Sequence, residues 1–342
     1  MKIGVKKTVI NPEFPVDLAG FGVPGRKSAG VHDYIYLSVM VAEHDGKKAA
    51  FICADIIGFD QKLVKDLKSS IYRRFGFHED EVFFNASHTH SGPQTLTYML
   101  SLVGKADADY LAFFNQKLYS AFEDALNDLE ETEVYAAVTK SDIGINRRLI
   151  AEGKALFAPN EDGPADNCVT VIKFSTGDRV KAVLFNYACH PSIVCTNNVS
   201  ADYPGYAKKT VEEHFGKGTV AFFMQGCCGN IRARTVENGR FRSGTWDDVA
   251  GFGSLLGQNV IDACEGNMQK IEDFNILTAI SHIDLPLEEI PSRKYYEEVK
   301  QQNSPGKKEW AEKMRLNYES LKSSRSFIIH RISIGKKLRL SE

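Results

Sequence analysis

The chain has 342 residues, of which 43% are hydrophobic and 25% charged, an ordinary composition for a soluble globular protein of one large domain or two. Its 42 lysines and arginines nearly balance 44 aspartates and glutamates, so the net charge of −2 gives no electrostatic reason to expect a nucleic acid or an acidic membrane surface as partner. The seven cysteines, an odd number without regular spacing, predict free thiols rather than a disulfide scaffold. The sequence shows neither a signal peptide nor an apolar run of about 18 residues, and we therefore expect a cytoplasmic protein without a transmembrane segment.

Short runs of Val, Ile, Phe and Ala predict buried strands, and apolar residues at four-residue spacing predict helices. In chain order we expect strands at 35–41 and 49–54, a helix at 61–75, a strand at 81–86, a helix at 109–129, a strand at 182–187, a helix at 206–215, a strand at 220–224 and a helix at 250–264. The alternation predicts an α/β fold, with a mixed, largely parallel sheet flanked by helices and the active site at the carboxyl ends of the strands.

The segment 288–326 differs from the rest because it is dense in Lys, Glu, Arg and Gln. A break at Ser304-Pro305-Gly306 predicts two charged surface helices, at 293–302 and 307–322. A strand is expected at 327–334, followed by a basic tail at 336–339.

Polar residues follow four of the expected strands. They are Asp55, the run Ser87-His88-Thr89-His90-Ser91-Gly92-Pro93, the run Cys189-His190-Pro191-Ser192, and the run Gln225-Gly226-Cys227-Cys228-Gly229-Asn230. Ligands of open α/β sheets bind beyond the carboxyl ends of the strands, so four such endings predict one site.

The histidines give that site its chemistry. His88 and His90 stand two residues apart and would project to one side of an extended chain, and His190 comes from a second strand end. Histidines from separate strand ends suit zinc, which accepts nitrogen ligands and keeps a position open in catalytic sites. A lone His-x-His pair has many other uses, and His190 alone could be a hydrogen-bonded turn residue; their shared placement favours the metal site.

Three other features of the sequence allow two interpretations each. Cys227-Cys228 lacks the two-residue spacer of zinc and redox motifs, and its flanking glycines favour a tight loop whose N–H groups face the pocket. Arg147 either binds an oxyanion or carboxylate or belongs to a surface basic pair with Arg148. Asp55 either orients a metal-bound histidine or lies at the N-terminus of the next helix.

At these motifs the sequence resembles the neutral/alkaline non-lysosomal ceramidase family, in its N-terminal catalytic domain. His-Thr-His-Ser-Gly-Pro is the most specific piece, and the other segments follow in the family's order. They are Thr8-Val9-Ile10-Asn11-Pro12, Leu18-Ala19-Gly20-Phe21-Gly22, Val31-His32-Asp33, Asp55, Ile145-Asn146-Arg147, Cys189-His190-Pro191, Ala201-Asp202-Tyr203-Pro204-Gly205 and Gln225–Asn230.

The resemblance implies a zinc-dependent hydrolase of a linear amide, which converts N-acyl sphingosine to sphingosine and a fatty acid. The implied partner is a small-molecule or lipid amide; the oligomeric state stays open, and family members are often secreted. Matched by motif, the metal ligands are His88 and His190, the catalytic residues are His90, Arg147 and Asn230, the substrate-binding residues are Cys228 and Gly229, and Asp55 lies behind the ligands.

The sequence departs from the family pattern at two places. Ile231-Arg232-Ala233 follows Gly229-Asn230, where ceramide-cleaving members carry a serine, and residues 331–335 resemble the strand before a Pro-Gly-Glu turn that is absent here. That turn supplies a zinc-binding glutamate in the family, and a tyrosine follows further on. We therefore expect residues 1–285 to form a ceramidase-like catalytic domain and 286–342 to be its incomplete end.

Two alternatives follow from these departures. One is a metal hydrolase for a polar or anionic amide or ester on the same scaffold, favoured by Arg232 and Arg234 near the pocket. The other is a catalytically inactive, truncated family member.

Overall fold

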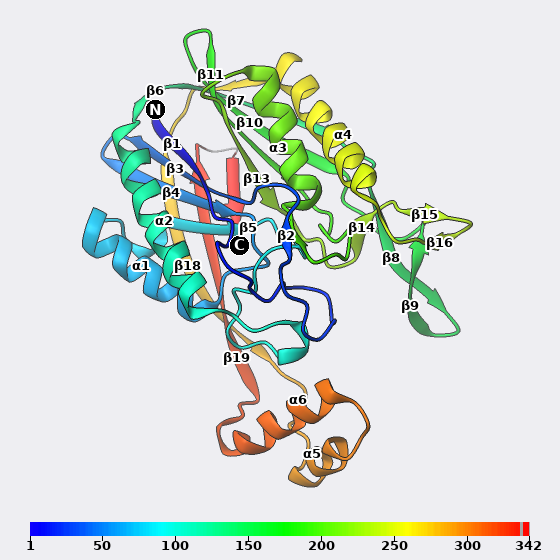
Figure 1. Ribbon diagram of the computed structural model, residues 1–342. Coiled ribbons are helices and arrows are strands. Elements are labelled where there is room, and N and C mark those ends of the chain that lie inside the picture. Colours follow the sequence, from blue (N-terminus) through cyan, green and yellow to red (C-terminus); the bar gives the residue numbers. More distant parts are fainter. Residues whose placement is uncertain (336–337, 342) are drawn as a thin grey trace.

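Two five-stranded sheets form the centre of the molecule, as seen in a computed structural model that describes residues 1–335 and 338–341 (Figure 1). The first sheet has the order β5-β4-β3-β1-β6, with β1 at Lys2–Val9, β3 at Tyr36–His44, β4 at Lys47–Ala54, β5 at Val82–Ala86 and β6 at Glu130–Glu131. The second has the order β13-β11-β10-β7-β17, with β7 at Glu133–Lys140, β10 at Cys168–Thr176, β11 at Arg179–Tyr187, β13 at Val220–Gln225 and β17 at Gln269–Ile271.

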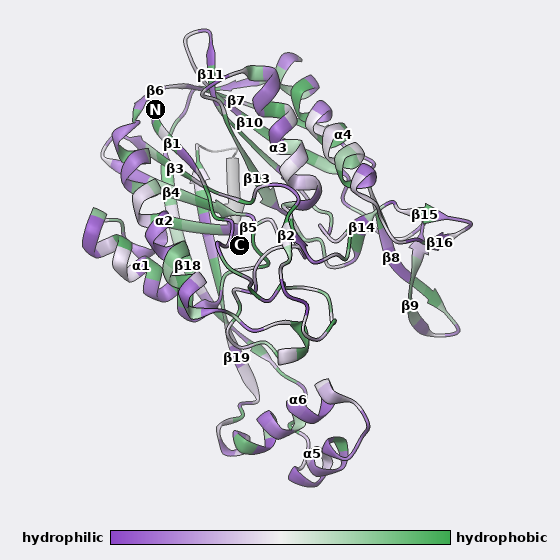
Figure 2. Cartoon of the chain, viewed as in Figure 1, coloured by the Kyte–Doolittle hydropathy of each residue, from purple (hydrophilic) through white to green (hydrophobic). Residues whose placement is uncertain are grey.

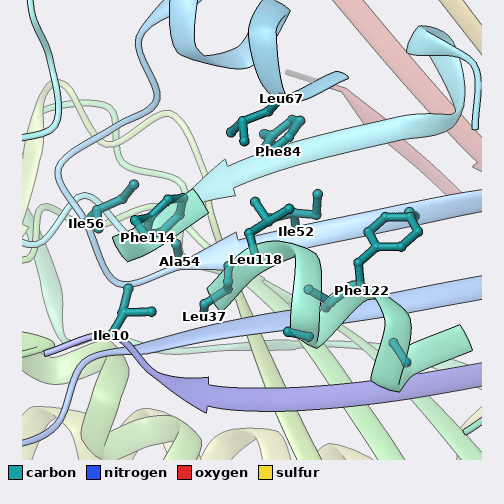
Figure 3. Packing of buried hydrophobic residues seen from close by; sticks show 14 of the residues in the cluster. Ile10, Leu37, Ile52, Ala54, Ile56, Leu67, Phe84, Phe114, Leu118 and Phe122 are labelled. Carbon is teal, nitrogen blue, oxygen red and sulfur yellow. The ribbon is translucent and has the colours of Figure 1, made fainter. Parts of the chain in front are cut away.

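Helices cover the outer face of each sheet, so the chain is layered helix–sheet–sheet–helix. The first sheet packs under α1 (Gln61–Phe75) and α2 (Ala108–Asn127), and the second under α3 (Asp202–Phe215) and α4 (Trp246–Glu265). Figure 3 shows part of the first interface, where Ile52 and Phe84 of the sheet meet Phe114 and Leu118 of α2. The inner faces of the sheets pack on each other through residues such as Phe51 and Phe222. Central strands such as β4 and β11 are therefore buried on two sides, which explains their continuous apolar runs.

The expected helices and strands are present, with shifts of a few residues at their ends. Helix α1 has the bounds expected from the sequence because both ends are capped: the Asp60 side chain accepts from the Lys62 N–H, and Gly76 ends the helix with φ 71°. Helix α3 starts four residues earlier than expected, at Asp202. The α/β class is confirmed.

The expectation of a largely parallel sheet is wrong. Among the named strands of the described residues, parallel pairing is confined to β4–β5, β11–β13 and the short pair of β2 (Gly30–Val31) with β12 (Asn198–Val199). Strands β3 and β4 instead form an antiparallel hairpin around Asp45 and Gly46, with φ of 47° and 74°. An Asp-Gly pair between apolar runs is a strong hairpin signal, because both turn residues need a positive φ.

A third group of strands lies beside the segment that follows β11. It comprises β8 (Gly144–Ala151) between β9 (Lys154–Asn160) and β14 (Ile231–Ala233), and the two-stranded β15 (Val236–Glu237) and β16 (Arg240–Phe241). The β8–β9 hairpin projects from the body next to β15 and β16 (Figure 1).

The charged segment is a helical hairpin held between two long strands. Strand β18 (Ile276–Pro286) pairs with β19 (Ser324–Ile334), which pairs with β20 (Leu338–Ser341). Between them, α5 (Arg293–Lys300) and α6 (Pro305–Leu316) enclose a small cluster of their own around Tyr296, Val299 and Ala311. Figure 2 shows these helices as largely hydrophilic, and they lie apart from the two central sheets.

Two expectations for this region have different outcomes. Helix α6 ends at Leu316, several residues before the expected 322. Of the expected basic tail, residues 336 and 337 lie outside the described residues, and 338 and 339 belong to β20. The division into 1–285 and 286–342 stays a prediction. None of the described helices is both long enough and apolar enough to cross a membrane.

Candidate active site

Three histidines from two sheets meet at one point. The ring centroids of His88, His90 and His190 lie 4.8 to 5.1 Å apart, and one nitrogen of each ring lies within 4.8 Å of the others. His88 and His90 follow β5 of the first sheet, and His190 follows β11 of the second. The expected convergence of separate strand ends is therefore present, although the ends belong to two sheets rather than one.

His88 is held by its own backbone turn. Strand β5 ends at Ala86, and His88 adopts φ 67°, a left-handed conformation that costs a non-glycine residue about 1–2 kcal/mol. The extended-chain reasoning for His88 and His90 is thus wrong, because a turn brings the rings together. The His88 Nδ1 lies 2.7 Å from the carbonyl oxygen of Ile57. A carbonyl only accepts, so Nδ1 carries the proton and Nε2 is left as a ligand atom.

His190 is fixed in the same manner from the other sheet. Its Nδ1 lies 3.0 Å from the carbonyl oxygen of Cys228, which again leaves Nε2 to bind. Its backbone N–H donates to the Ile231 carbonyl at 3.1 Å, and it forms an isolated parallel bridge with Arg232. The loop after β13 therefore positions His190.

His90 has a different environment. Both of its ring nitrogens are shielded from solvent and have no hydrogen-bond partner among the described residues. Gly20 lies against the ring so closely that a Cβ there would be 2.3 Å from the His90 Cγ. The guanidinium of Arg26 donates to the His90 carbonyl at 2.8 Å, and the Phe21 ring meets the imidazole edge-on at 5.1 Å. A buried imidazole with two unused nitrogens is suited to bind a metal or to exchange a proton with a substrate.

Gln225 and Asn85 join the two strand ends. The Gln225 N–H donates to Oδ1 of Asn85 at 2.9 Å, and the Gln225 side-chain amide donates to the carbonyls of Ser87 and Cys189. These two carbonyls directly precede His88 and His190. One amide therefore sets the spacing between the two histidine segments.

Burial lowers the pKa of all three imidazoles. Desolvation is the largest cause in each case: it brings the pKa of His190 to about 4, lowers the pKa of His88 and holds the pKa of His90 well below its usual range. The positive charge of Arg147 lowers each pKa further. The rings are thus neutral at neutral pH, the form that binds a metal ion, and the donor set of three imidazole nitrogens fits zinc.

The loop after β13 presents carbonyl groups to the site. The Gly229 carbonyl accepts from Nη2 of Arg147 at 2.9 Å, and the Cys228 carbonyl holds His190. The expectation that N–H groups of this loop face the pocket stays a prediction. The side chain of Asn230 donates to the Pro164 carbonyl at 2.8 Å, and its own carbonyl accepts from the Arg147 N–H.

Two sequence-predicted residues lie outside the histidine cluster. Asp55 is buried, and both of its oxygens accept from Nζ of Lys208 at 2.7 Å. The carbonyls of Ile57 and Cys228, rather than Asp55, orient the histidines. Arg234 forms an ion pair with Glu161 at 2.7 Å, which corrects its expected place near the pocket.

Three supporting residues have no role in the sequence-based prediction of the site. Gly20 and Gln225 occur in segments that resemble the family, so a signal for them existed. Arg26 stands in no motif, and only the structure shows that it donates to the carbonyls of Ala19, His90 and Thr196.

Comparison with known proteins gives one family. The model of the neutral/alkaline non-lysosomal ceramidase N-terminal domain matches residues 2–249. The neutral ceramidase from Pseudomonas aeruginosa is 17% identical, with a TM-score of 0.72 over 98% of this chain and 60% of that one. A ceramidase complexed with C2 is 19% identical, with a TM-score of 0.69 over 83% of this chain and 46% of that one.

The chain thus spans between 46% and 60% of the length of these two structures. At such identities the two structures establish the shared fold. The family model covers well over half of the chain, and the protein belongs to the neutral/alkaline non-lysosomal ceramidase family.

Proposed function

We propose that the protein is a zinc-dependent hydrolase that cleaves the N-acyl bond of a linear amide, with ceramide as the family substrate. The observation that carries the proposal is the convergence of three neutral imidazoles, one buried and two half-buried, beside Arg147. Membership of the ceramidase family supports the reaction class.

The roles of the histidines follow from their hydrogen bonds. His88 and His190 have anchored Nδ1 atoms, so their Nε2 atoms are held ready as metal ligands. A zinc ion held there supplies Lewis-acid activation of water and of the amide carbonyl. His90 has both nitrogens unused and is placed to hold a proton for the leaving amine.

Arg147 supplies fixed positive charge. Its side chain is tied to the Gly229 carbonyl through Nε at 3.2 Å and Nη2 at 2.9 Å, which orients the guanidinium before a substrate arrives. A preorganised cation stabilises the charge that develops on the amide oxygen in the transition state. We assign Asn230, Cys228 and Gly229 to the wall of the substrate site.

Hydrolysis of a short-chain N-acyl panel that includes ceramide tests the proposal. The full chain with zinc should release fatty acid, a chelator should abolish release, and His88→Gln should lower the rate by at least about a hundredfold. His282→Gln, in an exposed histidine on β18, is the control and should retain the parental rate. Absence of turnover on every amide, with zinc bound, would favour the catalytically inactive alternative.

A further inference from the structure

A cavity lies next to the histidine cluster and is lined by arginine and aromatic side chains. It encloses about 550 Å³ and is walled by Phe21, Phe157, Ile193, Arg232 and Phe241 among others. Phe21 is shared with the histidine cluster, since its ring contacts His90. Ser192 and Ile193 of the wall follow His190 directly in the chain. A substrate whose amide reaches the histidines therefore has this cavity beside it.

Arg232 is the central polar group of the cavity. Its guanidinium lies 4.6 Å from the ring centroid of Phe241 and 5.5 Å from that of Phe157. Its Nε is shielded from solvent and has no hydrogen-bond partner among the described residues, and its Nη2 has only a long contact of 3.4 Å to the Thr235 hydroxyl. A buried charged donor without an acceptor is unfavourable, so this group is suited to an acceptor that comes from a ligand.

The charges around the cavity leave an excess of positive charge. Arg242 is neutralised by Asp248, to which it donates at 2.6 and 2.7 Å, but Arg240 lies in the wall with no ion pair among the described residues. None of the described side chains that form the wall is acidic. Asp202 is the acid whose charge acts on Arg232, and its own carboxylate already accepts from the N–H groups of Ile193 and Tyr203.

We propose that this cavity binds an anionic group of the substrate, a carboxylate or a phosphate on the polar part of the amide, through Arg232 and Arg240. The inference rests on the proposed amide hydrolysis and names its substrate class. The aromatic walls accommodate the carbon atoms that join the anionic group to the amide. Arg232 binds this group and takes no part in bond cleavage, so it determines specificity.

Three matched amides test the inference. N-lauroylglycine carries a carboxylate, N-lauroylphosphoethanolamine carries a phosphate, and N-lauroylethanolamine is neutral. We expect kcat/KM for one or both anionic amides to exceed that for the neutral amide by at least about tenfold, the effect of one or two charge-assisted hydrogen bonds. Arg232→Gln should lower kcat/KM for the anionic amides by at least about tenfold more than for the neutral amide, and so remove this preference. Comparison of kcat/KM for N-lauroylglycine and N-lauroylphosphoethanolamine shows whether the cavity binds a carboxylate or a phosphate.

Matched variants separate specificity from folding. Arg234→Gln is the control, because Arg234 stands two residues away and is paired with Glu161 outside the cavity. It should keep the parental preference, and Arg232→Lys should keep part of it because the charge remains. Thermal unfolding of each variant verifies the fold. Equal rates on charged and neutral amides in the parent, or equal losses on both in Arg232→Gln, would overturn the inference.

A binding measurement keeps this inference independent of catalysis. Cys195 is an exposed free thiol in the cavity wall, whereas Cys168 is an exposed free thiol elsewhere. N-lauroylglycine or N-lauroylphosphoethanolamine should slow alkylation of Cys195 relative to Cys168, and Arg232→Gln should abolish the protection. Protection without hydrolysis would reject the proposed function and retain the anion site. Hydrolysis with no preference for the anionic amides and no protection of Cys195 would support the proposed function and reject the anion site.

Discussion

Gly20 is the residue where one added methyl group most directly perturbs the site. A Cβ at this position would lie 2.3 Å from Cγ, 2.5 Å from Nδ1 and 2.8 Å from Cβ of His90. The imidazole would have to move by about 1 Å to restore an ordinary contact. A shift of the His90 backbone cannot relieve this contact, because hydrogen bonds hold the backbone on both sides. The His90 N–H donates to the Pro191 carbonyl at 3.0 Å, and the His90 carbonyl accepts from Arg26.

The Gly20→Ala substitution should therefore damage catalysis more than folding. The positive φ of 88° adds strain of about 1–2 kcal/mol, which lowers the melting temperature by a few degrees. A misplacement of about 1 Å in a catalytic group costs on the order of a hundredfold in rate. We expect kcat on an N-acyl amide to fall by about that factor in a protein that remains folded.

Gly22→Ala is the matched control in the same loop. A Cβ at Gly22 would meet nothing closer than 4.0 Å, and this glycine does not have a positive φ. The measurements are the rate of amide hydrolysis and the melting temperature of both variants. A folded Gly20→Ala with the parental rate would refute the reasoning, as would an equal loss in Gly22→Ala.

Two further predictions concern stability. Lys208→Met leaves the buried Asp55 carboxylate without its cation, so the free energy of unfolding should fall by about 3–5 kcal/mol in denaturant titrations, whereas Lys62→Met in an exposed pair should change it by less than about 1 kcal/mol. In the metal-free protein, the low pKa of His190 means that the unfolded chain gains a proton between about pH 6.5 and pH 4 before the folded chain does. The parent should lose about 3 kcal/mol of stability over that range relative to His190→Gln, and equal pH slopes in acid titrations of unfolding would contradict this.

The helices and the buried strands were predictable because their patterns are local. Helix α1 has its apolar stripe, an aspartate cap and a closing glycine within one segment, and the apolar strands β4, β11 and β13 occur where expected. The predicted strand direction is wrong for most pairs, because alternating strands and helices indicate parallel pairing only when no hairpin intervenes. The Asp45-Gly46 turn carried the missing signal.

The histidines of the site were predictable, but their supports were only partly so. His88, His90 and His190 follow strands, a position visible in the sequence. The backbone carbonyls of Ile57 and Cys228 orient His88 and His190. Because every residue has a carbonyl, the sequence does not mark these two as special. Which carbonyl meets which ring depends on how two sheets pack, and no local pattern contains that information. The same reason explains why the sequence does not predict the pairing of Asp55 with Lys208.

The zinc content of the purified full chain tests the central claim most directly. After incubation with zinc and dialysis, elemental analysis should give close to one zinc per chain for the parent. The double variant His88→Ala/His190→Ala should give almost none while remaining folded. A parent that retains no zinc, or a double variant that retains as much as the parent, would contradict the account.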